Sequence, residues 1–159
     1  MKRLLLIVLA LLLSSCGFHL RGEQKVPFSE IGIDPSGTPL AKALQRELAF
    51  NHVKVVPASG KVYTLHILKN VQDRIILSLD AAGQVREYQL RYRVSFRLVS
   101  PTGRIAIPLS ELNLSRIMSY DVTEILAKTS EADLLNRNMV DDAANQILRR
   151  LGSVHTDEN

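Results

Sequence analysis

The feature that most constrains the fold is an alternation of apolar and polar residues between Val85 and Ser100. One set of positions is mainly apolar: Tyr88, Leu90, Tyr92, Val94, Phe96 and Leu98. The other set is polar: Glu87, Gln89, Arg91, Arg93, Ser95 and Arg97. Successive side chains of a strand point to opposite faces, so this period of two predicts one long strand. It requires a sheet with one face on a core and the other in solvent.

The segments on either side predict two more long strands. Apolar residues recur through 63–79 and again through 105–117. Tight turns are predicted at 82–84 (Ala-Gly-Gln) and 101–103 (Pro-Thr-Gly), since glycine and proline favour turns. The phase of the last strand slips, which predicts a bulge near Pro108. Together the three strands predict an antiparallel meander.

Two amphipathic helices complete the pattern. Thr38 can cap a helix that starts at Pro39 and carries an apolar stripe over 40–48, and Asn51 is placed to end it in a left-handed conformation. A second helix is predicted from Ser130, where Ser130 and Asp133 resemble a capping box.

Its apolar stripe continues to Leu151, and Gly152 ends it. The segment 121–129 before it predicts only a short helical turn. With brief strands at 31–34 and 53–56, the predicted fold class is α+β: a two-layer sandwich of a mostly antiparallel sheet with two helices on one face.

The start of the chain has the layout of an export signal. Lys2 and Arg3 precede an apolar run, 4–13, that is too short to span a bilayer. The run leads into Leu-Ser-Ser-Cys at 13–16, which resembles a bacterial lipobox. We therefore predict that the thiol of Cys16 is acylated. There are two alternatives: an ordinary cleaved signal with an incidental cysteine, or an uncleaved anchor.

Acylation at this cysteine would divide the chain into four parts. We predict a signal peptide at 1–15, a lipidated tether at 16–29, a domain at 30–152 and a tail at 153–159. Three acyl chains would anchor the protein permanently, since each buried methylene contributes about 0.8 kcal/mol. Cys16 is the only cysteine, so a core rather than a disulfide must stabilise the mature domain.

Composition argues against catalysis. Removing Lys2 and Arg3 from 20 basic residues leaves 18 against 16 acidic ones, so the mature chain is nearly neutral. The four histidines are scattered, and the sequence has no metal-ligand spacing, phosphate loop or serine-elbow motif. We predict no enzyme activity and no cofactor, and an exported lipoprotein is not expected to bind nucleic acid.

The polar face of the central strand stands out because Arg91, Arg93 and Arg97 project from it together. Glu87 is the only acid among the residues around them, and we expect no acid on that face close enough in sequence to neutralise them. The face can be a solvated surface that resists edge pairing. Alternatively, it can bind phosphorylated or acidic partners, because guanidinium groups match phosphate oxygens bidentately.

Several stretches resemble one family. Cys-Gly-Phe-His-Leu-Arg-Gly at 16–22 resembles the start of mature members of the LptE family of lipopolysaccharide-assembly lipoproteins, and the similarity continues at 83–89, 126–128 and 143–151. The resemblance implies two helices on one face of a mostly antiparallel sheet. It also implies a plug-like partner inside the β-barrel LptD, which helps to assemble the barrel and to pass lipopolysaccharide to the outer leaflet.

The resemblance further implies lipopolysaccharide binding through cationic residues. Lys128, predicted in the loop before the last helix, matches a basic position of the family. We therefore expect Arg91, Arg93 and Lys128 to contact lipopolysaccharide phosphates or the acidic wall of the barrel. Gly17 after the cysteine, by resemblance to enterobacterial-type lipoproteins, implies the outer membrane, with the domain on its periplasmic face.

Two other classes of function stay open. An auxiliary lipoprotein of a different envelope lipid-transport system would share a small α+β fold but bind lipid or an inner-membrane partner. A periplasmic hydrolase would need a catalytic constellation, which the sequence does not offer.

Overall fold

The computed structural model describes residues 25–154. The predicted signal peptide, Cys16 with its predicted acylation, and the chain from residue 155 lie outside this range. The elements in chain order are β1 (Glu30–Asp34), α2 (Pro39–Phe50), β2 (Lys54–Val56), β3 (Tyr63–Leu79), β4 (Val85–Val99), β5 (Ile105–Ser119), the short 3-10 helix η1 (Val122–Glu124) and α3 (Ile125–Gly152).

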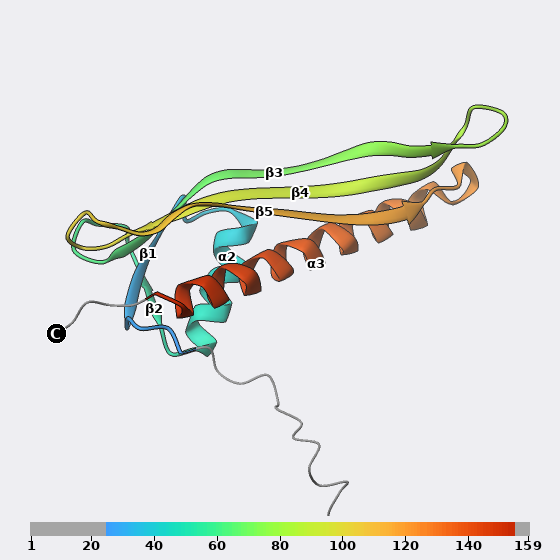
Figure 1. Ribbon diagram of the computed structural model, residues 1–159. Coiled ribbons are helices and arrows are strands. Elements are labelled where there is room, and N and C mark those ends of the chain that lie inside the picture. Colours follow the sequence, from blue (N-terminus) through green and yellow to red (C-terminus); the bar gives the residue numbers. More distant parts are fainter. Residues whose placement is uncertain (1–24, 155–159) are drawn as a thin grey trace, which may run out of the picture.

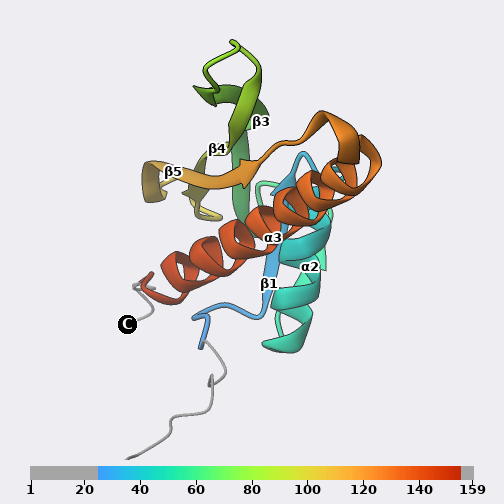
Figure 2. The ribbon, with the colours of Figure 1, turned by 90° about the vertical axis from the view of Figure 1, so that its right-hand side faces the viewer.

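One open five-stranded sheet has both helices on the same face (Figure 1, Figure 2). The strand order is β2-β1-β3-β4-β5. Strands β3, β4 and β5 form the predicted antiparallel meander, whereas β1 pairs in parallel with both β2 and β3. The predicted α+β fold, with a mostly antiparallel sheet and two helices on one face, is confirmed.

The molecule has two unlike ends, because β3, β4 and β5 run far beyond β1 and β2 (Figure 1). Within β3, only residues 63–66 pair with β1. We call the far part of the long strands and the first half of α3, residues 68–93 and 110–138, the distal half. The remainder, with β1, α2, β2 and the last part of α3, is the packed half.

The meander follows the predicted turns and bulge. Gly83 and Gly103 both have φ +80°, the left-handed conformation that glycine adopts without strain. Phe96 pairs with Ser110 but Leu98 pairs with Ile107, so β5 contributes one extra residue beside Pro108. The predicted bulge is therefore confirmed.

Helix α2 begins as predicted but ends differently. Thr38 Oγ1 accepts a hydrogen bond from the Ala41 N–H at 3.1 Å, and Pro39 occupies the first turn. Asn51 has φ −93°, so the prediction that it is left-handed is wrong. Its side-chain amide donates instead to the Glu47 carbonyl at 2.7 Å, and the following residue, His52, takes the positive φ of 59°.

Helix α3 begins at Ile125, so the predicted start at Ser130 is wrong. The Ser130 hydroxyl donates to the carbonyl of Leu126 at 3.1 Å, a bond that serine makes inside a helix rather than at its cap. As a consequence Lys128, predicted in a loop, lies in the first turns of α3. The predicted end at Gly152 is confirmed.

Strand β1 passes very close to the chain after β2. A Cβ atom added at Gly32 would lie 2.7 Å from the Cα of Ala58, which is backbone and cannot turn aside. Only glycine fits this crossing. Nearby, the ring of Phe28 stacks on Tyr63 with centroids 4.8 Å apart, and Val26 packs against the core. Residues of the predicted tether thus contact the domain.

Candidate functional site

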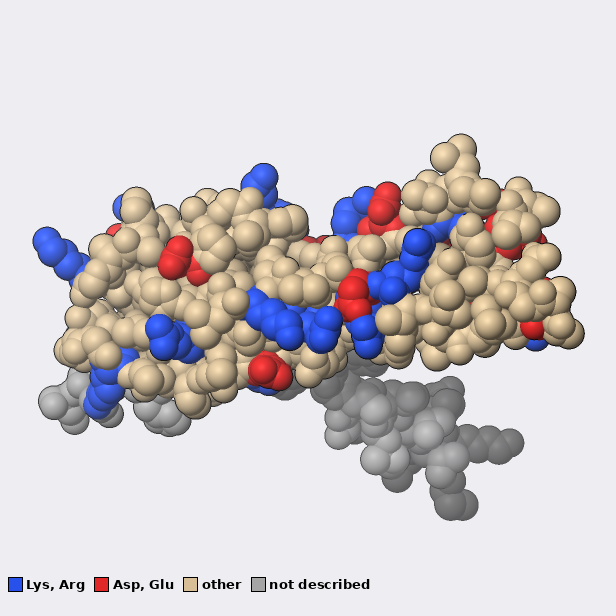
Figure 3. Space-filling model, turned by 90° about the horizontal axis from the view of Figure 1, so that it is seen from above, with Lys and Arg blue, Asp and Glu red and all other residues tan. Residues whose placement is uncertain are grey.

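Basic and acidic side chains lie on the outer face of the sheet, away from the helices (Figure 3). Directly opposed residues of neighbouring strands share a face. The register puts Asp73 of β3 opposite Arg91 and Val71 opposite Arg93, and it puts Lys69 opposite Ser95. Arg91 and Arg93 therefore lie on one face, and the carboxylate of Asp73 on the neighbouring strand lies on the same face.

Asp73 is the partner of both arginines. Its Oδ2 accepts hydrogen bonds from Arg91, from Nε at 3.1 Å and from Nη2, and its Oδ1 accepts one from Arg93 Nη2 at 3.4 Å. The hydrogen bond from Arg91, helped by the charges of both arginines, holds the pKa of Asp73 below its usual 3.8. The expectation that no acid neutralises this face is wrong, because the acid comes from the neighbouring strand.

The face carries as many acidic as basic side chains. Lys69, Arg91, Arg93 and Arg97 share it with Asp73, with Glu87 of the same strand, with Glu111 opposite Ser95, and with Asp34, whose partner His66 lies opposite Arg97. Arg91 and Arg93 are 35% and 39% exposed, so their guanidinium groups are partly accessible to an anion. The Nε of Arg93 is buried and has no hydrogen-bond partner.

Lys128 does not join this cluster. Its ammonium group donates to Glu131 Oε2 at 2.9 Å and to Ser119 Oγ at 3.1 Å. Ser119 lies four residues along β5 from Ser115, the residue that pairs with Arg91. At about 3.3 Å per residue, that is about 13 Å along the strand.

Polar contacts join the distal strands to α3. Gln72 Nε2 donates to the Asn136 carbonyl at 3.3 Å, and Arg116 Nη2 donates to Asp142 Oδ2 at 2.5 Å. Within the sheet, the hydroxyl of Tyr92 donates to Asn70 Oδ1 at 2.8 Å, and burial raises the pKa of that hydroxyl. The contacts of Gln72 and Arg116 thus add polar pairing to the apolar packing of α3.

Apolar side chains gather on the surface of the distal half. Of the 13 exposed large apolar residues in the described part of the chain, ten lie there: Leu68, Val71, Ile76, Leu77, Leu79, Ile117, Val122, Ile125, Leu126 and Leu134. Leu126 is 84% exposed. Exposed apolar residues that gather in one region are typical of an interaction surface.

Within residues 25–154, no group of three or more His, Cys, Asp or Glu side chains is arranged to hold a metal ion. No helix in the same range combines the length and apolar character that crossing a membrane requires.

The family model for LptE, described as lipopolysaccharide-assembly, matches residues 26–151. The chain belongs to the LptE family. The LPS-assembly lipoprotein LptE of Photorhabdus laumondii is 32% identical over 161 residues, which cover 98% of this chain and 87% of that relative.

Two solved structures of lipoproteins are similar to this chain. The solution structure of an uncharacterized lipoprotein B from Nitrosomonas europaea has a TM-score of 0.73 and 33% identity, covering 86% of this chain and 91% of that one. The crystal structure of the rare lipoprotein B from Shewanella oneidensis has a TM-score of 0.69 and 28% identity, covering 78% and 94%.

Membership in the LptE family bears on the predictions made from the sequence. The family resemblance is confirmed, and so is the prediction of a non-enzyme, since the family comprises lipopolysaccharide-assembly components. The binding roles of Arg91, Arg93 and Lys128 and the acylation of Cys16 stay predictions. Sequence reasoning missed Asp73, which counting outward from the β3–β4 turn could have found, and the apolar surface of the distal half.

Proposed function

We propose that this LptE-family chain is an outer-membrane lipoprotein, acylated at Cys16 and held at the periplasmic face. In this proposal it docks as a plug in the β-barrel LptD, assists assembly of the barrel and helps to deliver lipopolysaccharide to the outer leaflet. Family membership supports a part in lipopolysaccharide assembly. The observation that carries the docking step is the apolar surface of the distal half.

The position of the anchor supports docking through the distal half. A strand of 15 residues such as β4 spans about 50 Å at about 3.3 Å per residue. The described chain starts in the packed half, so a lipid on Cys16 would hold that half near the membrane (Figure 1). The tip of the distal half would then lie up to about 50 Å from the anchored end, where its apolar side chains can enter the barrel.

Contact through side chains is favoured over addition of a strand. Beyond residue 66 the edge of β3 has no partner strand among the described residues. That edge carries Lys69 and Arg74 and has register shifts near 67–69 and 76–79, which oppose pairing with another strand. At the β3 edge, docking through the apolar side chains is therefore favoured over addition of a strand.

The test is affinity purification of the tagged full chain from Gram-negative envelopes, with mass spectrometry to identify LptD. Leu77→Ser/Leu126→Ser should reduce recovery of the barrel at least about tenfold, since two exposed apolar contacts are lost from the docking surface. Phe50→Ser/Leu109→Ser is the matched control, because these residues are 69% and 62% exposed but lie in the packed half.

Recovery of wild-type protein without LptD would reject the plug proposal. An inner-membrane partner in its place would favour an auxiliary lipoprotein of another envelope lipid-transport system. Equal loss of LptD from both double variants would show that the distal half has no special part in docking.

Lipopolysaccharide contact at Arg91 and Arg93 is the second part of the proposal. Arg91→Glu/Arg93→Glu would set two new acids beside Asp73 and should abolish salt-sensitive binding of purified lipopolysaccharide to the detergent-solubilised chain. The control, Arg86→Glu/Arg137→Glu, makes the same charge change at exposed positions elsewhere. Equal binding by the two double variants would return the face to a solvated surface.

Lys128 needs a separate variant, because it lies about 13 Å along β5 from the arginines. Lys128→Gln leaves Glu131 and Ser119 in place and removes one charge. If lipopolysaccharide spans both positions, this variant should lower affinity by a further, smaller factor. Unchanged affinity would assign Lys128 to its contacts with Glu131 and Ser119 alone.

A further inference from the structure

A polar hollow lies in the outer face of the packed half. It has a volume of about 650 Å³, within the usual range for small-ligand sites. Residues from two segments, 58–62 and 99–103, form most of its lining, and Asp34 and His66 complete it. Because His66 lies opposite Arg97 in the sheet, the hollow shares the face that carries the arginines.

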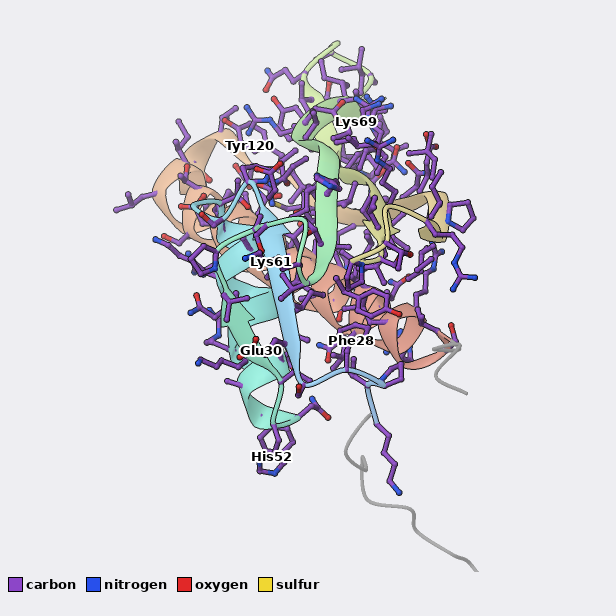
Figure 4. All side chains as sticks on the ribbon, turned by 90° about the vertical axis from the view of Figure 1, so that its left-hand side faces the viewer. Phe28, Glu30, His52, Lys61, Lys69 and Tyr120 are labelled. Carbon is purple, nitrogen blue, oxygen red and sulfur yellow. The ribbon has the colours of Figure 1, made fainter. Side chains whose placement is uncertain are left out.

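Hydrogen bonds hold both walls of the hollow in place. In the first wall, the hydroxyl of the buried Thr64 donates to the Ser59 carbonyl at 3.2 Å. In the second, the Oγ of the buried Ser100 lies 2.9 Å from Thr102 Oγ1. Figure 4 shows this end of the molecule, where the label of Lys61 marks the segment of the first wall. A site with fixed walls loses little conformational entropy when a ligand enters it.

The charge of the lining favours a ligand with hydroxyl groups over a phosphate. No Lys or Arg is among the described residues that line the hollow, and the carboxylate of Asp34 would repel an anion. The side chain of Asp34 is 61% exposed, so its carboxylate can accept hydrogen bonds from hydroxyl groups of a ligand. His66 Nδ1 lies 3.4 Å from Asp34 Oδ2, which orients the carboxylate.

Apolar side chains lie beside these polar groups. Val62, Val99 and Pro101 line the same hollow. A pyranose ring carries hydroxyl groups around its edge and C–H groups on its faces. It therefore matches a preformed hollow in which a few polar groups are set among aliphatic ones.

The hollow lies about 20 Å from the nearer arginine of the proposed lipopolysaccharide contact. Thr64 pairs with Val99, which is six residues along β4 from Arg93, and a strand rises about 3.3 Å per residue. One ligand reaches both places only if it is extended, with phosphates at one end and several sugars beyond them.

We propose that this hollow binds the pyranose hydroxyl groups of an oligosaccharide, with Asp34 as their main acceptor. The oligosaccharide belongs to the lipopolysaccharide whose phosphates contact Arg91 and Arg93. The inference rests on that proposed contact and deepens it, because it adds a separate site for the sugars. It is compatible with the plug, since the apolar surface of the distal half meets the barrel and the polar hollow stays open to the sugar chain.

The test is a titration of the isotope-labelled full chain in detergent, followed by NMR, with the oligosaccharide that mild acid releases from lipopolysaccharide. The amide signals of Gly60 and Gly103, which line the hollow, should move. Inorganic phosphate should leave them in place. Asp34→Asn should weaken binding of the oligosaccharide at least about tenfold, because hydrogen bonds to a charged acceptor are lost. Asp133→Asn makes the same change at an exposed position on α3 and should bind like wild type.

A second variant tests the hollow without changing a charge. A Cβ added at Gly60 meets nothing within 4 Å, so Gly60→Leu should fold normally and fill part of the hollow. It should weaken binding of the oligosaccharide. Gly37→Leu is the matched control, because a Cβ there also meets nothing within 4 Å and Gly37 does not line the hollow. Equal binding by the two leucine variants would overturn the sugar site.

The disaccharide of N-acetylglucosamine and N-acetylmuramic acid distinguishes the source of the sugar. If it moves the signals of Gly60 and Gly103 as strongly as the released oligosaccharide does, the assignment to lipopolysaccharide is overturned. A chain that binds whole lipopolysaccharide, while the released oligosaccharide moves neither signal, overturns the sugar site and leaves the proposed function standing. A chain that binds neither overturns the proposed lipopolysaccharide contact as well.

Discussion

The two halves of the sheet differ in what covers them. In the packed half, α2 and the last part of α3 lie on the strands, and every described apolar residue with no exposed surface belongs to this half. In the distal half α3 alone lies beneath the strands, polar pairs such as Gln72–Asn136 join the layers, and most exposed large apolar residues gather there. The packed half therefore provides most of the buried core, and the distal half provides most of the exposed apolar surface.

The largest expected effect comes from a matched pair of truncations. Ile147 is fully buried between the helices and sheet, whereas Ile117 in the distal half is 60% exposed. Ile147→Ala should lower the free energy of unfolding by about 2–5 kcal/mol, because it leaves a cavity. Ile117→Ala should change it by less than about 0.5 kcal/mol.

Urea unfolding of both variants followed by circular dichroism gives the comparison. Similar losses of stability for the two variants would mean that the distal surface is packed in solution, and the distinction between the halves would fail.

A substitution at Gly32 tests how tightly the packed half is packed. Gly32→Ala forces the backbone at Ala58 to move and should cost about 1–3 kcal/mol of unfolding free energy. Gly37→Ala is the control, because a Cβ added there would meet nothing within 4 Å and the φ of Gly37 is not positive. It should be neutral or slightly stabilising by thermal melting. A neutral Gly32→Ala would show that the crossing has room to relax.

The smallest effect is expected at the ion pair of the distal half. Because the pKa of Asp73 is lowered in the folded protein, its contribution to stability is complete above pH 3.8 and is lost as the pH falls through the folded value. Asp73→Asn should therefore be less stable than wild type at neutral pH, and the difference should shrink below pH 3.8. Urea unfolding of both proteins, from about pH 2.5 to about pH 7, measures this difference.

Asp133→Asn removes a carboxylate from an exposed position on α3 and serves as the control. A difference at Asp73 that does not depend on pH would mean that the carboxylate makes no favourable contact with the arginines.

Local signals in the sequence predicted much of the fold. The alternation of β4 is read directly from residue types, since a period of two leaves few alternatives to a strand. Thr38 with Pro39, and Gly83 and Gly103 in their turns, are likewise decided by their own backbone chemistry. These elements needed no knowledge of distant residues.

The errors arose where a partner elsewhere decides the outcome. Centring the β3–β4 turn on Ala82 pairs Arg91 with Asp73, whereas centring it one residue later pairs Arg91 with Ile75. A shift of two residues in register thus changes an ion pair into an unpaired arginine, although the faces stay the same because the side-chain period is two. Similarly, Ser130 can cap a helix or bond back inside one, and only the helical course of 125–129 decides between them.

The pairing of α2 with α3 sets the order in which the chain can mature. Leu40, Leu44 and Leu48 emerge early in synthesis, yet the helix against which α2 packs is the last element of the described chain. The meander of β3, β4 and β5 needs only neighbouring segments and can form before α3 is complete. The apolar stripe of α2 must therefore stay shielded from aggregation until the final helix arrives.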